Sequence, residues 1–568
     1  MKYSWDLKKI YSKKEDFYYD MTLIRDKLKK LCEYKEMKID GNTLYELMNK
    51  CFEIREINFK TLLYASLSYY TDINNEYFVK MKEQAESLDN IVNNETNFID
   101  ELINIIEYDN LNLFYEQCDQ LKDYKFYIDN VKRLGKHICN NIDLVNLNKE
   151  NINNCLLNYN NLIKNMNFGN INDISLNNSN ISKYLIDENR DIRKKSFDNV
   201  NKIYISKGLE FFNIFKELVD SKKNIANIKN YSSVLESELS LENINSSLIT
   251  NLINSVNDNI FLMNKYLKLK CNYLKLDNLN LYDMNINIVN NNKDVYSLDN
   301  AIKIIKESLS VLGEKYIESI DYLINNNHLD LECNEKKHPT IIFSWNTYSF
   351  INYKDRYIDL KNLAHELGHI INCYYSIKNQ PYIYNDSTVF IGEVVALVNE
   401  ILLNDYLYNI SEIKEQKIFY LTKIIENFIS QVYRPTMYTE FENLIYNNNL
   451  DLEFLNNSYL SLVKKYYGDV VNIDSDIACE WMRVGHLFRW SYYVYKYAMG
   501  YILAFNVIKK LRDGALNTYI DFLSSGSSCS NEDMLKKLDI DLYSIDLFSD
   551  TFSLFNDYIT KLENMLNS

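Results

Sequence analysis

The residues best suited to chemistry form one short motif, His365-Glu366-Leu367-Gly368-His369. Residues four apart lie on the same face of a helix, so both imidazoles of a helical motif can reach one metal ion. Glu366 is rotated by about 100° from His365, which places it to take a proton from a water molecule on that ion rather than to join the ligands. Two His ligands with a Glu base are typical of zinc hydrolases, and we expect one Zn2+ per chain.

A zinc site of this kind needs a third protein ligand and leaves the fourth position to water. The chain has only 6 His, and those upstream of the motif have no helical pattern around them. Glu393 is the better candidate, because it lies in a run with helical apolar spacing beside Gly392, which we expect to allow close helix packing. Glu400 follows on nearly the same face. We predict that Glu393 is a metal ligand and that Glu400 orients a ligand imidazole, with a surface salt bridge as the alternative for Glu400.

The apolar pattern predicts the elements that must carry these residues. Helical periodicity dominates, for example over residues 22–34. Residues 339–345 and 349–353 are instead rich in β-branched and aromatic side chains, which predicts two short strands joined by a turn at Asn346-Thr347. We therefore expect a small β-sheet at about residues 339–353, followed directly by the helix that contains the motif.

The composition favours a helical chain without nucleic-acid or membrane partners. Only 12 Gly and 3 Pro occur in 568 residues, which argues for long helices and few tight turns. A formal net charge of −15 disfavours binding to a phosphate backbone. No uncharged apolar run is long enough to span a membrane, and the N-terminal residues lack the apolar stretch of a secretory signal. The 10 Cys form no Cys-x-x-Cys pair, which indicates free thiols and a cytoplasmic location.

Several segments together resemble the oligoendopeptidase F family of thimet-oligopeptidase-like zinc metallopeptidases. The motif, followed by Glu393, is the first of them. The family often has a Gly-rich segment before the motif helix, and this segment is not recognisable here. The other matching segments are Trp5-Asp-Leu7 with Tyr11, Gln380-Pro-Tyr-Ile-Tyr384, Tyr433-Arg-Pro-Thr-Met437 with Glu440-Phe-Glu442, Trp481-Met-Arg-Val-Gly-His486 and Tyr492-Tyr-Val-Tyr-Lys-Tyr-Ala-Met-Gly500.

The resemblance implies a mainly α-helical, bilobed ellipsoid with a deep central channel and a zincin-type catalytic core. We expect an N-terminal helical lobe over residues 1–200 and a zinc metallopeptidase domain over residues 201–568, with the lobes interlocked rather than independent. By the same resemblance, His486 and a nearby tyrosine bind the oxyanion of the reaction. Tyr495 is the first choice for that tyrosine and Tyr492 the second.

The function implied is zinc-dependent hydrolysis of internal peptide bonds in short unfolded oligopeptides, with the water activated by Glu366. The predicted strand 339–345 could pair with a substrate backbone, which makes Ile341, Phe343 and Trp345 candidate substrate-binding residues. We expect no nucleic-acid or membrane partner, and a monomer or weak homo-oligomer. Two alternatives remain: a dipeptidyl carboxypeptidase or other exopeptidase on the same scaffold, and a helical peptide-binding protein without catalysis.

Overall fold

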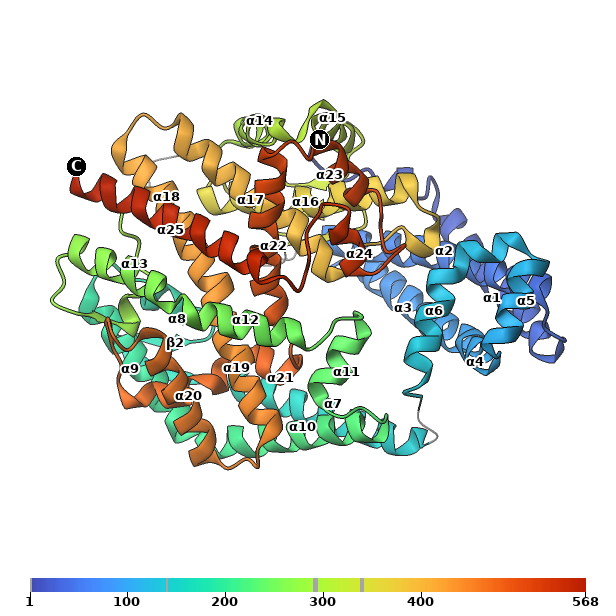
Figure 1. Cartoon of the computed structure of the whole chain (residues 1–568), viewed down its shortest axis with the longest axis horizontal. Coiled ribbons are helices and arrows are strands. Elements are labelled where there is room, and N and C mark those ends of the chain that lie inside the picture. Colours follow the sequence, from blue (N-terminus) through green and yellow to red (C-terminus); the bar gives the residue numbers. More distant parts are fainter. Residues whose placement is uncertain (1–2, 139–140, 290–294, 338–341) are drawn as a thin grey trace. The chain divides into compact units, whose positions relative to one another are not determined.

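A computed structural model describes residues 3–138, 141–289, 295–337 and 342–568 of the chain (Figure 1). Helices predominate over this part, and the sheets that occur have only two or three strands, as predicted. The chain forms two compact units, each assembled from three segments. The first comprises Met1–Lys136, Asp294–Leu403 and Leu511–Leu538, and the second comprises His137–Lys293, Asn404–Lys510 and Asp539–Ser568.

The compact units do not follow the predicted lobe boundary. The division between residues 200 and 201 falls inside a helix of the second unit, Arg190–Ser206. Both units instead combine segments from distant parts of the sequence. The assignment of an N-terminal lobe and a catalytic domain to residues 1–200 and 201–568 stays a prediction.

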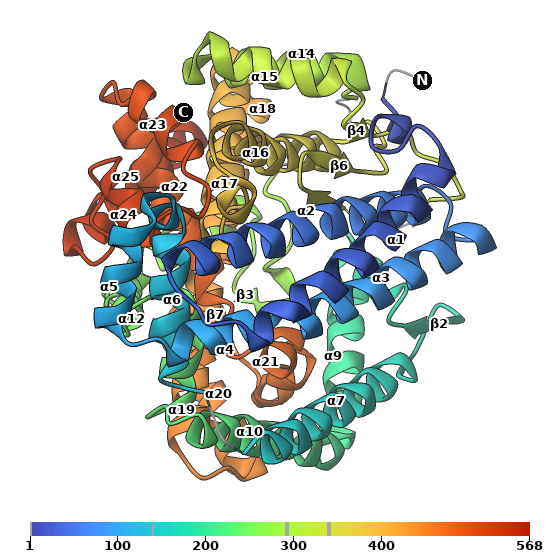
Figure 2. The ribbon, with the colours of Figure 1, turned by 90° about the vertical axis from the view of Figure 1, so that its right-hand side faces the viewer.

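The N-terminal part of the first unit is a set of antiparallel helices around a long central one. Helices α1, α2 and α3 run side by side in Figure 2, and α2 contacts both α1 and α3. Asp40 begins α2 by accepting a hydrogen bond from the Thr43 backbone N–H, and Asn75 begins α3 in the same way. The helices are α1 (Lys14–Leu31), α2 (Gly41–Thr71), α3 (Glu76–Thr96), α4 (Phe98–Ile105), α5 (Tyr108–Gln117) and α6 (Lys125–Gly135).

The rest of the first unit holds a three-stranded sheet and the helices around it. The strand order is β4-β6-β5, with β4 parallel and β5 antiparallel to β6, so β5 is an edge strand. Strands β5 and β6 are joined by the predicted turn at Asn346-Thr347. The elements are α14 (Leu298–Ser308), α15 (Glu314–Asn325), β4 (Leu329–Asp330), β5 (Phe343–Trp345), β6 (Tyr348–Phe350), α16 (Tyr357–Asn379), the first part of α17 (Val389–Ile410), α23 (Leu516–Leu523) and α24 (Asn531–Lys536).

The second unit is also mostly helical. Pairs α7 and α10, and α18 and α25, pack along their lengths. Its first segment contains α7 (Ile142–Lys164), β1 (Asn167–Ile171), β2 (Ile174–Asn177), α8 (Ile181–Leu185), α9 (Arg190–Ser206), α10 (Gly208–Ile228), α11 (Val234–Leu241), α12 (Ser247–Asp258), α13 (Ile260–Tyr273) and β3 (Leu279–Asn280). Its later segments contain α18 (Lys414–Phe428), the π-helical turn η7 (Ile429–Tyr433), α19 (Arg434–Asn447), α20 (Leu452–Tyr467), β7 (Val471–Asn472), the 3-10 helix η8 (Ser475–Arg483), α21 (Gly485–Arg489), α22 (Tyr495–Arg512) and α25 (Ile545–Asn567).

Two expectations about the chemistry of the chain can be compared with the described residues. In that part of the chain, no helix is both long enough and apolar enough to cross a membrane. Every cysteine that the structure describes is a free thiol, as the scattered spacing predicted, while Cys139 lies outside the described residues.

Candidate metal centre

The motif lies on α16, and the start of this helix is fixed by a buried carboxylate. Asp359 is 2% exposed. Its Oδ2 accepts hydrogen bonds from the backbone N–H groups of Arg356 at 3.1 Å and Lys354 at 3.2 Å. The same carboxylate binds the Arg356 guanidinium through both oxygens, at 2.9 and 2.8 Å. These contacts satisfy amide donors that precede the first helical turn and so set where α16 begins.

Helix α16 packs very closely on α17 at Gly368. A Cβ at this position would lie 2.6 Å from Ala396 Cα and 2.9 Å from Ala396 N, which is closer than side chains pack against backbone. Gly392, where we predicted the close approach, would place its Cβ at an ordinary distance of 3.5 Å from His369 Nδ1. The tight contact is therefore made by Gly368 on α16 and not by the predicted Gly392 on α17. It brings α17 close to the motif.

The close packing of the two helices brings three donor atoms together. His365 Nε2 and His369 Nε2 are 3.1 Å apart. His365 Nε2 and Glu393 Oε2 are 3.9 Å apart. All three ligand atoms lie within 4.8 Å of one another. Within the residues that the structure describes, no other group of at least three His, Cys, Asp or Glu side chains converges in this way.

This donor set fits a zinc ion. Zinc–ligand bonds of about 2.1 Å in a tetrahedron separate neighbouring donors by about 3.4 Å. The observed separations of 3.1 and 3.9 Å lie on either side of that value. Burial, together with the charge of His365, lowers the pKa of His369 to about 3, so its imidazole is neutral and keeps a lone pair for a metal. Burial also raises the pKa of Glu393, because a buried carboxylate is costly to ionise. A cation beside this carboxylate would offset that cost.

Glu400 contacts a motif imidazole, as we predicted for a residue that orients a ligand. Its Oε1 lies 2.8 Å from His365 Nδ1, on the ring atom opposite the donor Nε2. Its other oxygen binds Lys361 Nζ at 3.0 Å. Burial opposes ionisation of Glu400, but Lys361 and His365 outweigh it and lower its pKa to about 2. Glu400 is 5% exposed, so the surface salt bridge that we considered as an alternative does not describe it.

A buried amide next to Glu400 ties α17 to α16 and α15. Asn399 Nδ2 donates to the Ala364 carbonyl at 3.0 Å, one residue before His365. Asn399 Oδ1 accepts from Tyr316 Oη at 2.9 Å. Both hydrogen bonds are buried, which strengthens them and makes their loss costly. The position of α17 against the motif is therefore fixed by hydrogen bonds as well as by the contact at Gly368.

Glu366 is not part of the converging donor set, and its hydrogen-bond partner, Ser344, is a residue that the sequence analysis missed. Ser344 Oγ donates a short hydrogen bond to Glu366 Oε2 and lies 3.3 Å from the Glu366 carbonyl. Burial raises the pKa of Glu366, while the charge of His365 and the hydrogen bond from Ser344 oppose the rise. The strand pattern contained the signal, because Ser344 must face the opposite side from Phe343 and Trp345.

The edge strand β5 and the donor atoms line one pocket of about 710 Å³. Two candidate substrate-binding residues, Phe343 and Trp345, are half-buried in its wall. Their rings also contact α2, with ring centroids of Phe343 and Tyr70 4.7 Å apart and those of Trp345 and Phe59 6.0 Å apart. The third candidate, Ile341, lies outside the described residues.

The predicted oxyanion-binding residues all lie in the second unit. His486 is on α21, and burial together with Arg489 lowers its pKa. Tyr492 is 2% exposed and donates to Asn443 Oδ1 at 3.0 Å. Tyr495 is 1% exposed. Neither hydroxyl has a described hydrogen bond to His486.

The tyrosine beside His486 is Tyr497, which the sequence analysis did not select. Its Oη lies 3.5 Å from His486 Nε2, and the two rings meet edge to face. The helical pattern could have indicated this choice. Tyr495, Ala498, Met499 and Ile502 form an i, i+3, i+4, i+7 stripe that is fully buried, which assigns Tyr495 to the core face of α22.

The helical fold and the motif helix together place the chain among the metallopeptidases. A family model described as "Peptidase family M3" matches residues 184–554. The chain therefore belongs to peptidase family M3.

Individual relatives agree with the predicted resemblance to oligoendopeptidase F. The chain is 33% identical over 353 residues to oligopeptidase PepF of Bacillus subtilis, a match that covers 60% of this chain and 52% of that protein, or about half its length. It is 28% identical to an oligoendopeptidase F homolog of Borreliella burgdorferi, with 99% of this chain and 98% of that protein covered. The resemblance is thereby confirmed.

Solved structures agree with the fold. A crystal structure from Chlamydophila abortus, assigned as a peptidase, matches with a TM-score of 0.89 and 25% identity, covering 99% of this chain and 98% of that chain. Oligoendopeptidase-F from Enterococcus faecium matches with a TM-score of 0.73 and 21% identity, covering 97% and 99% of the two chains. The mainly helical fold class is confirmed, while the predicted bilobed shape with a central channel stays a prediction.

Proposed function

We propose that this chain is a zinc-dependent endopeptidase that hydrolyses internal peptide bonds of short, unfolded oligopeptides. The observation that carries the proposal is the convergence of His365, His369 and Glu393 ligand atoms within 4.8 Å, in the wall of a pocket that also contains Glu366. Membership of peptidase family M3 supports peptide-bond hydrolysis. The names of the relatives support oligopeptides as substrates.

His365, His369 and Glu393 would hold the ion, and Glu400 would keep the ring of His365 in place. A bound Zn2+ supplies a Lewis acid that polarises a peptide carbonyl and lowers the pKa of a water molecule toward about 7. Glu366 accepts a proton from the attacking water and delivers it to the leaving amine. The hydrogen bond from Ser344 holds the Glu366 carboxylate in one orientation for both transfers.

We propose that the substrate binds as an added strand on β5. An edge strand offers unpaired backbone groups, and β5 lies in the same pocket wall as the ligand cluster. Pairing through the main chain requires an extended segment that is free of its own hydrogen bonds, which favours unfolded peptides over folded proteins. Because backbone groups are the same in every residue, this binding tolerates many substrate sequences.

We further propose that His486 and Tyr497, rather than Tyr495 or Tyr492, donate to the substrate oxyanion. The role of His486 rests on the resemblance of the segment Trp481–His486 to the family. The choice of Tyr497 rests on the 3.5 Å separation between its hydroxyl and His486 Nε2. Both side chains can donate a hydrogen bond to an oxyanion, which is a large contribution to catalysis of acyl transfer.

The proposal can be tested with internally quenched peptides of graded length, with and without a zinc chelator. We expect cleavage that the chelator abolishes and added Zn2+ restores. Glu366→Gln should keep zinc, measured by metal analysis, and lose turnover, whereas Glu393→Gln should lose both. Cleavage that is insensitive to the chelator, or full activity of Glu366→Gln, would contradict the mechanism. Mass spectrometry of the products distinguishes internal cleavage from trimming of dipeptides or single residues at an end.

A further inference from the structure

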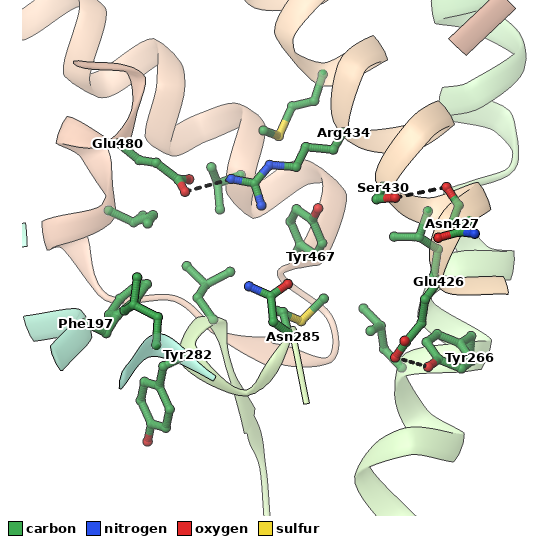
Figure 3. Close-up of a pocket in the computed structure, with 18 of the residues that line it drawn as sticks. Phe197, Tyr266, Tyr282, Asn285, Glu426, Asn427, Ser430, Arg434, Tyr467 and Glu480 are labelled. Carbon is green, nitrogen blue, oxygen red and sulfur yellow. Dashed lines mark hydrogen bonds and ion pairs between the residues drawn. The ribbon is translucent and has the colours of Figure 1, made fainter. Parts of the chain in front are cut away.

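The second unit contains a cavity that shares no residue with the metal centre. Its volume is about 310 Å³, and Figure 3 shows the side chains that surround it. One wall is the continuous helical run of α18, η7 and α19. The other walls come from α8, α9, α13, the segment after β3, α20 and η8. Cavities of this size commonly hold small molecules.

The helical run that forms the first wall is wound irregularly where it borders the cavity. The side chains of Lys423, Asn427, Ser430 and Arg434 line the cavity at intervals of three or four residues. Between Ile429 and Tyr433 the helix makes a π-helical turn, a feature that is often found at functional sites. The wider turn accommodates Pro435, which has no N–H and whose ring would meet the carbonyl of residue 431 in a regular α-helix.

On one side of the cavity, two arginines bind the same carboxylate. Glu480 Oε1 accepts from Arg434 Nη2 at 2.8 Å and also binds Arg483. Glu480 Oε2 accepts from Tyr459 Oη at 2.8 Å. Burial opposes ionisation of Glu480, but the two arginines outweigh it and lower its pKa to about 2. Glu480 is therefore ionised, and both of its carboxylate oxygens accept hydrogen bonds. Its one negative charge balances only one of the two arginines, so this side of the cavity has a net positive charge.

The other side repeats the same arrangement with lysines. Glu426 Oε1 accepts from Lys270 Nζ and from Tyr266 Oη, both at 2.8 Å. Lys423 Nζ lies 3.3 Å from Glu426 Oε2. Each carboxylate at the cavity thus has two cationic partners. The cavity is locally positive in a chain whose formal net charge is −15.

Polar groups that can bind a ligand project into the space between these two sides. Figure 3 shows the Arg434 guanidinium and the Asn285 amide pointing into it from opposite walls. The Arg434 side chain is 39% exposed, and no hydrogen bond from its Nη1 is found among the described residues. Asn427 also lines the cavity, and its buried Nδ2 has no hydrogen-bond partner among the described residues. Apolar and aromatic side chains complete the lining, namely Phe197, Leu267, Tyr282, Met437, Val463 and Tyr467.

We propose that this cavity binds a small organic anion, an apolar or aromatic body with a carboxylate or phosphate group that Arg434 contacts. A guanidinium with a free edge is suited to both groups, because its planar donors match two oxygens at once. The apolar part of the ligand lies along the apolar wall and extends toward Lys423. The lysines on that side of the cavity add positive electrostatic potential. The site is independent of the proposed peptidase activity, and its ligand is detected by binding rather than by turnover.

The test is calorimetric titration of the full chain with phenyl phosphate, phenylacetate, inorganic phosphate and the uncharged benzyl alcohol. We expect saturable binding of at least one of the two aromatic anions, weaker binding of inorganic phosphate and none of benzyl alcohol. Arg434→Gln should weaken anion binding by roughly 10-fold or more, because it removes a charge-assisted hydrogen bond. Lys414→Gln removes the same charge from an exposed position of α18 and should leave binding unchanged.

A second variant tests the same site in case Arg434→Gln fails to fold. Asn285→Trp fills the cavity from an exposed position while leaving both ion clusters in place, and it should also abolish binding. Circular dichroism and zinc content report whether each variant folds. No saturable binding of either aromatic anion, equal binding by all variants, or inorganic phosphate binding as tightly as phenyl phosphate would overturn the proposal.

Discussion

Replacing Gly368 by Ala should destabilise the first unit, although Ala favours helices. The substitution gains about 1 kcal/mol in helix propensity. The new Cβ would lie 2.6 Å from Ala396 Cα and 3.1 Å from the Val395 carbonyl oxygen, and these backbone atoms cannot rotate away. Helices α16 and α17 must therefore separate. Overpacking of this kind costs about 1–3 kcal/mol, and so short a contact lies at or beyond the upper end of that range, which leaves a net loss of about 2 kcal/mol.

The matched control is Gly392→Ala, at the same helix pair. The nearest atom to its new Cβ is His369 Nδ1 at 3.5 Å, an ordinary contact, so the gain of about 1 kcal/mol in propensity should remain. Urea unfolding of the metal-free chains, followed by circular dichroism, should show a lower midpoint for Gly368→Ala than for wild type and an equal or higher one for Gly392→Ala. Equilibrium dialysis should show that Gly368→Ala also binds Zn2+ more weakly, since separating the helices moves Glu393 away from the motif.

The two variants make the reasoning refutable. If Gly368→Ala matched Gly392→Ala in urea midpoint and kept wild-type zinc affinity, the close approach of α16 and α17 would not be what positions the ligand cluster. A loss of zinc affinity without a change in stability would mean that the helices separate at little energetic cost, and the estimate of about 2 kcal/mol would be wrong.

Four further substitutions test single side chains. Ser344→Ala removes a hydrogen bond that lowers the pKa of Glu366, so the acidic limb of kcat/KM against pH should shift to higher pH; an unchanged profile would exclude this role. Glu400→Gln should weaken zinc binding by about 10–100-fold in a chelator competition, because a charged partner of His365 is lost. Tyr497→Phe should lower kcat by about 10²–10³, while Tyr495→Phe should leave kcat nearly unchanged; the reverse order would restore Tyr495 as the donor.

The pairing of the two motif histidines could be predicted from the sequence because helical spacing alone determines it. His365 and His369 are four residues apart on one helix, so their convergence needs no tertiary information. Glu393 and Glu400 could be predicted because they share one face of a second apolar helix. The small sheet and its turn at Asn346-Thr347 were also predictable, since β-branched and aromatic side chains cluster there within an otherwise helical sequence.

What escaped the sequence analysis depends on contacts between distant elements. The close approach at Gly368 is set by where α17 crosses α16, which no local pattern contains. Ser344 is a common residue whose role appears only when β5 lies against the motif helix. The cavity charges depend on Glu426 and Glu480, which are far apart in the sequence and each collect two cations from different elements. Tyr497 differs from these, because the buried stripe through Tyr495 was visible in the sequence and was not used.

The length of the edge strand β5 affects both the proposed binding of peptides and the tendency of copies of this chain to associate. It has 3 residues, Phe343–Trp345, within the described part of the chain. Long, open edges attract other copies of the same protein and promote aggregation, and very short edge strands are one way in which proteins limit this. A three-residue edge offers too few backbone groups to hold a second sheet. In the proposed binding mode, a peptide gains from contacts with both β5 and the metal centre. A peptide N-methylated at the amides that pair with β5 would keep its side chains and lose this contact, which suggests a simple design for inhibitors that resist cleavage.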